Sequence, residues 1–214
     1  MMKLLYIFSD SYKSLEGNVC CLVIFSFCLS CISGQVLSQE IKMNYNVKKG
    51  DKVIGTFTVA ETNTAALKTI KLESHIKTSF IVSIAVDAKE ESIFQNGVLS
   101  QSSVFRQVNG DEKVNKKHRF YGTGYVIEAG KKRDTLCCTQ IVFNLMNLYC
   151  TEPISIGKVY SDNYQKFLVI QTTEPHIYRI DVPDGSYNKY FYKDGKCIKV
   201  EIHQSLYTII MVLT

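Results

Sequence analysis

Residues 67–77 read LKTIKLESHIK, and this stretch decides the fold class. Apolar or small side chains occupy every second position, and charged or polar side chains fill the positions between them. The first set is Ile70, Leu72, Ser74 and Ile76, and the second is Lys71, Glu73, His75 and Lys77. A strand points successive side chains to opposite faces, so the alternation predicts a half-buried strand with one face in water.

The rest of the chain after Ile41 repeats this layout as short runs divided by turn signals. The turn signals are Gly50-Asp51, Asn96-Gly97, Asn109-Gly110-Asp111, Pro183-Asp184-Gly185 and Asp194-Gly195. Asn-Gly is a strong hairpin signal because both central residues of a tight hairpin turn need positive φ. Phe80–Val86 predicts a central strand, and the charged run Asp87–Glu91 suggests an interruption after it. Sequential strands joined by tight turns predict an antiparallel meander of about 11–12 strands.

The spacing of apolar residues changes between Cys138 and Tyr149. Ile141, Leu145 and Leu148 follow the spacing of a helix face, and Pro153 comes shortly afterwards. We therefore expect a mainly β protein: a single antiparallel, strongly curved sheet or open barrel with one packed helix near residues 138–149. One helix covers only part of a concave sheet face, so a groove or cavity is expected beside it.

The N-terminal segment has the order of a secretory signal peptide. Val19–Ile32 is an uncharged apolar run, with Lys3 and Lys13 upstream and small residues downstream. The pattern predicts cleavage after Ser38, with Gly34 as second choice, leaving 39–214 as a single β-rich domain. The alternatives are an uncleaved N-terminal anchor, lipidation at Cys31, and a buried core helix. The protein is expected to be exported, either periplasmic or secreted, and to contact a membrane only through an uncleaved or lipidated leader.

The net charge narrows the classes of partner that the protein could bind. The net charge of +5 is too small for a nucleic-acid-binding surface.

Four of the eight cysteines lie in the leader. The others can form three complete disulfide pairings, among which the sequence does not choose. These possible disulfide participants are Cys137, Cys138, Cys150 and Cys197.

The sequence contains no motif for catalysis, a metal or a cofactor. GxSxG and GxGxxG are absent, and the four histidines are scattered. Glu90 and Glu91 do not form a catalytic carboxylate pair, because adjacent residues of a strand face opposite ways. The basic run Lys116–Arg119 is expected to be a solvated face. Tyr149 and Glu152, at the expected helix end, are the candidate ligand contacts.

Several stretches together resemble a known family. They are Tyr45–Gly55 (YNVKKGDKVIG), Phe94–Gly97 (FQNG), Leu148–Tyr160 (LYCTEPISIGKVY) and Val182–Gly195 (VPDGSYNKYFYKDG). They resemble an uncharacterised, secreted domain-of-unknown-function family of Bacteroidota. In layout this family is similar to curved-sheet envelope proteins of the lipoprotein-sorting carrier type. The resemblance covers nearly all of the chain after the leader and implies no catalytic residue.

These observations predict a non-catalytic exported protein. Its concave sheet face would bind a lipid or other apolar small molecule. The alternative is an envelope protein whose outer face or sheet edge binds another protein.

Overall fold

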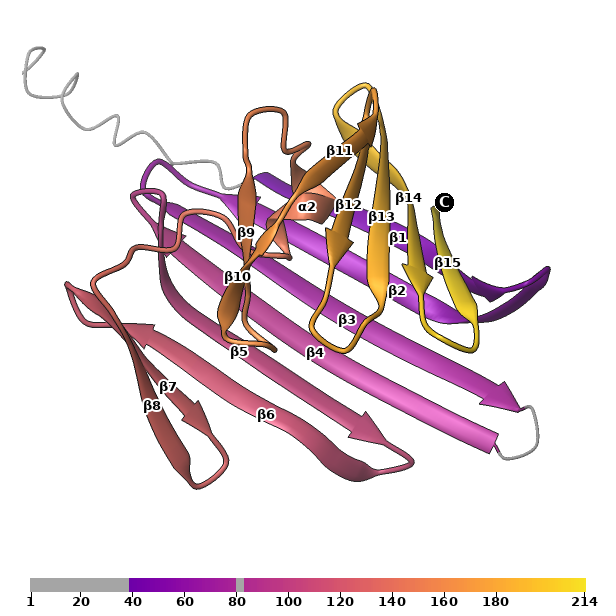
Figure 1. Cartoon of the computed structure of the whole chain (residues 1–214), viewed down its shortest axis with the longest axis horizontal. Coiled ribbons are helices and arrows are strands. Elements are labelled where there is room, and N and C mark those ends of the chain that lie inside the picture. Colours follow the sequence, from indigo (N-terminus) through magenta and orange to yellow (C-terminus); the bar gives the residue numbers. More distant parts are fainter. Residues whose placement is uncertain (1–38, 80–82) are drawn as a thin grey trace, which may run out of the picture. The chain divides into compact units, whose positions relative to one another are not determined.

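The computed structural model describes residues 39–79 and 83–214, so the predicted leader and its predicted cleavage positions lie outside the described residues. Within those ranges the chain forms fifteen strands and one short helix (Figure 1). The N-terminal strands are β1 (Gln39–Lys49), β2 (Lys52–Asn63), β3 (Leu67–Ser79), β4 (Ser83–Gln95), β5 (Val98–Val108), β6 (Asp111–Phe120), β7 (Gly124–Ala129) and β8 (Lys132–Cys137). The later elements are α2 (Asn147–Cys150), β9 (Lys158–Ser161), β10 (Lys166–Val169), β11 (Gln171–Glu174), β12 (Ile177–Asp181), β13 (Tyr187–Lys193), β14 (Lys196–His203) and β15 (Thr208–Leu213).

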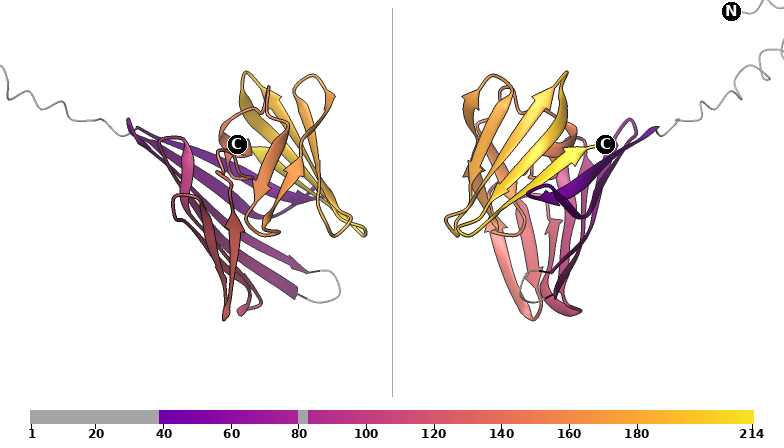
Figure 2. Two further views of the ribbon diagram at one scale, coloured as in Figure 1. Left: turned by 60° about the vertical axis from the view of Figure 1, so that its left-hand side comes forward. Right: turned by 90° about the vertical axis from the view of Figure 1, so that its right-hand side faces the viewer.

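Thirteen of the described strands form one antiparallel sheet, which confirms the predicted fold class. Strands β1 to β8 pair in sequence order, and β11 to β15 form a second meander. The last strand joins the first, with Tyr45 opposite Leu213. The end strands β8 and β11 do not pair with each other in this order, so the sheet curves without closing (Figure 2).

The turn chemistry explains the register of the long hairpins. Asn96 and Gly97 have φ values of 50° and 80°, the conformation that a two-residue hairpin turn requires. The alternation of β3 places Ile70 and Leu72 in the core and leaves Lys71 exposed. The predicted break at Asp87–Glu91 is wrong, because β4 runs through it without interruption. The outward-facing charged side chains of this run form ion pairs with β3. In one of them, the Glu91 carboxylate lies 3.5 Å from Nζ of Lys71.

A bulge and a glycine bend the sheet between β1 and β2. The pairing register shifts between Val47 and Lys48, and Gly55 lies opposite Val47. A Cβ atom on Gly55 would lie 2.2 Å from the carbonyl oxygen of His75 on β3. Only glycine therefore permits this close approach of two strand backbones, and bulges of this kind increase local twist.

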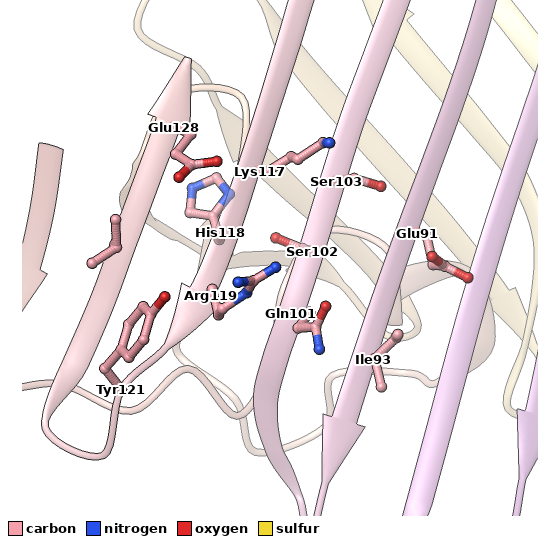
Figure 3. A pocket seen from close by; sticks show the side chains of 11 residues that line it. Glu91, Ile93, Gln101, Ser102, Ser103, Lys117, His118, Arg119, Tyr121 and Glu128 are labelled. Atoms are coloured by element: carbon pink, nitrogen blue, oxygen red, sulfur yellow. The ribbon is translucent and has the colours of Figure 1, made fainter. Parts of the chain in front are cut away.

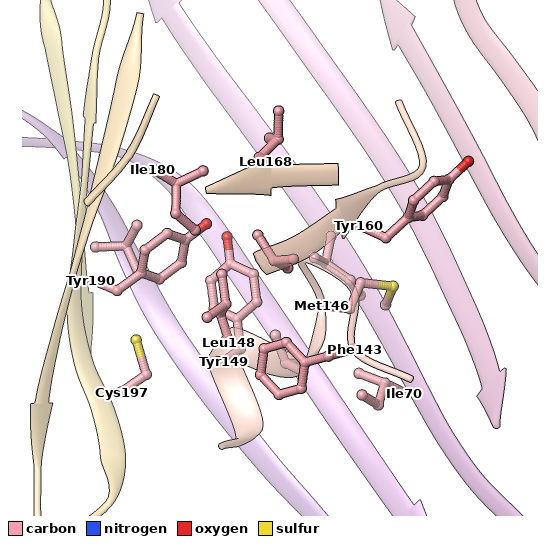
Figure 4. Close-up of a cluster of buried hydrophobic side chains, with 14 of the residues drawn as sticks. Ile70, Phe143, Met146, Leu148, Tyr149, Tyr160, Leu168, Ile180, Tyr190 and Cys197 are labelled. Carbon is pink, nitrogen blue, oxygen red and sulfur yellow. The ribbon is translucent and has the colours of Figure 1, made fainter. Parts of the chain in front are cut away.

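The segment between β8 and β11 packs into the concave side of the sheet, where it carries α2 and the small β9–β10 sheet (Figure 1). Tyr125 fixes its start, donating a hydrogen bond to the carbonyl of Leu99 at 2.8 Å and accepting one from the Ile141 amide at 3.0 Å. Tyr192 fixes its middle by donating to the Leu148 carbonyl at 2.5 Å. Figure 4 shows the resulting core, in which Leu148 and its neighbours meet side chains of the sheet.

The helix in this segment is much shorter than predicted. It spans Asn147–Cys150, whereas we expect residues 138–149 from the sequence. The apolar residues at helical spacing are buried from different kinds of backbone: Ile141 enters the core from a stretch without helix, whereas Leu148 lies within the four-residue helix α2. The backbone of Ile141 pairs with Leu99 and with Tyr125 rather than with its own chain, so sheet contacts replace helical ones.

Candidate functional site

A cavity of about 460 Å³ remains between the concave sheet face and the inserted segment. Its wall is formed by strands from both meanders, by α2, and by the turn between β9 and β10. The apolar lining includes Val47, Phe57, Leu72, Ile76, Val86, Ala88, Val108, Leu145, Met146, Tyr149, Val182, Tyr190, Ile202, Ile209 and Met211. This volume lies in the range of pockets that hold small molecules.

Along β3 and β4 the lining of the cavity becomes more exposed toward the end of β3 and the start of β4. Ile76, Val86 and Val108 lie opposite one another near those strand ends and are partly exposed. Leu72, which also lines the cavity and lies opposite Glu90 further along β3, is 5% exposed. An apolar chain entering from the strand ends would therefore pass from partly exposed to fully buried apolar surface.

Glu90 is the charged residue of β4 that faces this cavity. Its carboxyl oxygen lies 3.9 Å from Nη2 of Arg106 on β5, and the two side chains are 22% and 37% exposed. Because Glu90 lines the cavity, the surface that it exposes faces the cavity space. Burial raises the pKa of Glu90 to about 7, the nearby Arg106 opposes the rise, and the negative charge of Asp162 adds to it.

Asp162 is a second carboxylate in the wall, and described residues satisfy it. Ser102 donates a hydrogen bond to Oδ1 at 2.5 Å, and Nδ2 of Asn144 donates to Oδ2 at 2.9 Å. Burial raises the pKa of Asp162 to about 6, although these two hydrogen bonds act in the opposite direction. The pair of donors holds Asp162 in place as part of the wall.

His118 is buried beside Asp162 without a hydrogen bond. Its Nδ1 lies 3.7 Å from the Asp162 carboxylate, which is too long for a direct hydrogen bond. Burial lowers the pKa of His118 to about 4, with Lys116 contributing in the same direction, so the ring is neutral at pH 7. In the described part of the chain, the buried polar atoms without a partner are both His118 ring nitrogens, Oδ1 of Asn144 and the hydroxyl of Tyr160.

The two sequence-predicted ligand contacts have different environments. Tyr149 lines the cavity and packs against Tyr190, with ring centroids 5.9 Å apart. Glu152 does not line it. Its carboxylate accepts a hydrogen bond from Tyr178 and pairs with His176, both at 2.9 Å. Glu152 therefore fixes the loop after α2, and its role as a ligand contact remains a prediction without support from this geometry.

The basic run on β6 divides between the two faces of the sheet. Lys117 and Arg119 are exposed on the outer face, where they line a hollow of about 250 Å³ with Glu91 and Glu128 (Figure 3). Lys116 instead donates a hydrogen bond to the carbonyl of Asn163 beside the interior cavity. The expected solvated basic face holds for Lys117 and Arg119 but is wrong for Lys116 and His118, because strand alternation sends those two side chains inward.

The four cysteines of the described chain are free thiols in this structure. Cys137 and Cys138 are exposed, Cys150 is partly exposed and Cys197 is buried. Burial raises the pKa of Cys197 to about 12, so this thiol stays protonated.

Two features are absent from the part of the chain that the structure describes. No group of three or more His, Cys, Asp or Glu side chains is placed to hold a metal ion there. None of the helices in that part of the chain is long and apolar enough to cross a membrane.

The signal that could have identified Glu90 was its phase in β4. Inward positions of that strand carry Ala88, Glu90, Ser92 and Phe94, while Lys89 and Glu91 point outward. A charged residue in the inward phase marks a polar site in a core. The sequence alone does not reveal this position, because the charged run Asp87–Glu91 predicts a gap between strands.

Comparisons with known proteins identify a family but no activity. No curated protein matches the chain. A crystal structure described as a beta-barrel-like protein of domain of unknown function DUF1849, from Brucella abortus, is similar at 9% sequence identity and a TM-score of 0.47. The match covers 83% of this chain and 96% of that one. A family model described as domain of unknown function DUF6134 matches residues 45–214. This chain therefore belongs to the DUF6134 family of domains of unknown function.

Proposed function

We propose that this protein binds an amphiphilic or apolar small molecule in its interior cavity and does so without catalysing a reaction. The observation that carries the proposal is the cavity of about 460 Å³ beside the inserted segment, whose wall combines apolar side chains with a smaller set of polar ones. Small-molecule sites in proteins are concave, mostly apolar and carry a few polar groups, and this cavity has a comparable volume and lining.

The energetics favour moderate affinity. Burying a methylene group contributes about 0.8 kcal/mol. Eight buried methylenes would contribute roughly 6 kcal/mol, from which the loss of translational and conformational freedom is subtracted. Hydrogen bonds at the polar part of the wall add to this. A micromolar dissociation constant requires about 8 kcal/mol, so we expect a ligand of this size to bind with a dissociation constant above micromolar, which suits a protein that must also release its ligand.

The proposed setting is the cell envelope. The sequence pattern of the leader supports export, and export of this chain would place the cavity beyond the cytoplasmic membrane. Similarity in layout to lipoprotein-sorting carriers, and an origin in Bacteroidota, are parts of the same proposal and rest on sequence resemblance. N-terminal sequencing of the exported protein should find Gln39 first. A protein that still begins at Met1 would indicate an uncleaved N-terminal anchor. A protein that begins at a modified Cys31 would indicate lipidation.

A neutral fluorescent probe tests ligand binding. N-phenyl-1-naphthylamine should gain fluorescence on entering the cavity of the wild-type protein. Ala88 is 8% exposed and lines the cavity, so Ala88→Phe fills it from one wall. Lys89→Phe adds the same side chain on the opposite face of the same strand and serves as the control. Loss of binding in both variants, or in neither, would contradict the cavity as the site.

The alternative is that a sheet edge binds an envelope protein. The described edges are short, since β8 has six residues and β11 has four. Strand β8 also carries two basic residues, Lys132 and Arg133. Charged side chains on an edge strand disfavour its pairing with a strand of another chain. These features favour the cavity over the edges. A specific partner recovered from envelope extracts, and lost on substitution within β8 or β11, would reverse that preference.

A further inference from the structure

Buried carboxylates in the described part of the chain differ in whether the protein supplies their hydrogen-bond partners. Glu61 pairs with Lys68 at 3.0 Å and accepts a hydrogen bond from Asn63 at 2.9 Å. Asp162 and Glu152 likewise accept hydrogen bonds from neighbouring side chains. Each of these groups is therefore satisfied within the protein.

Glu90 differs from them. It receives no hydrogen bond from any described residue, and the 3.9 Å separation from Arg106 exceeds hydrogen-bonding distance. Its side chain is 22% exposed, so the carboxylate is open to the cavity space, and no donor from the described part of the chain is directed at it. Since Glu90 faces the cavity, an occupant of the cavity can supply the missing donors.

The charge around Glu90 selects the kind of donor. The charged side chains among the described lining residues are Glu90, Asp162 and Arg106, two negative and one positive, which leaves one net negative charge when all are ionised. An anionic head group would meet two carboxylates in a region of low dielectric, where repulsion is strong. A cationic head group would neutralise the excess.

We propose that the ligand is a cationic amphiphile, with its ammonium group against the Glu90 carboxylate and its apolar chain extending past Ala88 and Val86 to the opening. This proposal rests on the proposed function and specifies its ligand. From Glu90 to Val86 the strand spans about 13 Å, at about 3.3 Å per residue. The polar end of the ligand therefore lies deep in the cavity, and the chain covers the apolar wall between it and the strand ends.

The groups that face Glu90 are compatible with this arrangement. Arg106 approaches from β5 and Asp162 from the turn after β9, while Tyr149 of α2 and Tyr190 of β13 interact with its charge. Arg106 is partly exposed and can turn toward solvent when an ammonium group enters. Because burial raises the pKa of Glu90 to about 7, binding of a cation should release a proton near neutral pH and should strengthen between pH 6 and pH 8.

The test compares three ligands that share one chain. Dodecylamine, 1-dodecanol and laurate displace N-phenyl-1-naphthylamine from the full chain at pH 8, below their aggregation concentrations. Dodecylamine should bind at least about tenfold more tightly than laurate, the ratio expected from one favourable and one unfavourable charge contact. Glu90→Gln should weaken dodecylamine binding about tenfold or more and change dodecanol binding little.

Glu91→Gln is the matched control, because Glu91 is the adjacent carboxylate on the outer face, paired with Lys71. It should leave the affinities for all three ligands unchanged. Binding of the neutral probe by Glu90→Gln shows that the variant is folded. Laurate binding as tightly as dodecylamine, or dodecylamine binding that Glu90→Gln does not weaken, would overturn the cationic ligand while leaving the proposed function intact. If none of the three ligands binds, the proposed function fails as well.

Discussion

Replacing Glu90 by glutamine should stabilise the protein, and the gain should grow with pH. Glu90 has a usual pKa of 4.5 and a folded-state pKa of about 7. A raised folded-state pKa means that the folded protein binds the proton more tightly than the unfolded chain does. The stability associated with that proton is present below pH 4.5 and is lost as the pH rises through 7. Glutamine mimics the protonated side chain at every pH.

The magnitude follows from the size of the pKa rise. At about 1.4 kcal/mol per tenfold difference in proton affinity, the penalty approaches about 3 kcal/mol at pH 8. Because Glu90 is 22% exposed, cavity water reduces this value, and we expect a gain of about 1–3 kcal/mol at pH 8 and less than about 1 kcal/mol at pH 5. With m-values of about 1–3 kcal/mol/M, the urea midpoint at pH 8 should rise by roughly 0.5–1.5 M.

Urea unfolding of wild-type protein, Glu90→Gln and Glu91→Gln at both pH values gives the comparison. Glu91 is 40% exposed and lies 3.5 Å from Lys71. Its substitution should therefore change stability by no more than about 0.5 kcal/mol at either pH. A Glu90→Gln protein that is no more stable than wild type at pH 8, or equally stabilised at pH 5 and pH 8, would refute the assignment of Glu90 as an unsatisfied cavity carboxylate.

Three further substitutions test the fold and the polar wall by urea unfolding. Gly55→Ala places a Cβ atom 2.2 Å from the His75 carbonyl oxygen and should cost about 1–3 kcal/mol; an unchanged midpoint would show that the strands can separate there freely. Tyr192→Phe removes the hydrogen bond to the Leu148 carbonyl and should cost about 1–2 kcal/mol; no loss would mean that water replaces the hydroxyl. The lowered His118 pKa of about 4 means that the unfolded chain gains a proton below pH 6.5 that the folded protein does not. His118→Phe should accordingly stabilise the protein about 2 kcal/mol more at pH 5 than at pH 7.5, and an equal effect at both pH values would contradict a buried neutral ring.

The strands could be predicted from the sequence because their signals are local. Alternation at Ile70 and Leu72 depends only on the pleat of one strand, and the Asn96-Gly97 turn depends only on two φ angles. Such features fix strand faces and hairpin registers independently of distant contacts. They therefore predicted a curved antiparallel sheet that the structure confirms.

The inserted segment could not be predicted in the same way. Ile141 and Leu148 lie at helical spacing, but their backbones bond to Leu99 and Tyr192, which are distant in sequence. The position of Glu90 in the cavity wall could not be predicted from the sequence for a related reason. Glu90 faces the cavity because its position in β4 points toward the concave side of the sheet and because the inserted segment leaves space there. The short charged run Asp87–Glu91 indicates neither of these facts.

Native mass spectrometry of the full chain, purified from a host that exports it, tests the occupied cavity most directly. We expect the wild-type protein and Lys89→Phe to carry a bound small molecule and Ala88→Phe to carry none. Extraction with organic solvent should then return an amphiphile with a basic nitrogen. A wild-type protein that carries no small molecule and takes up no N-phenyl-1-naphthylamine would contradict the claim that this cavity binds a ligand.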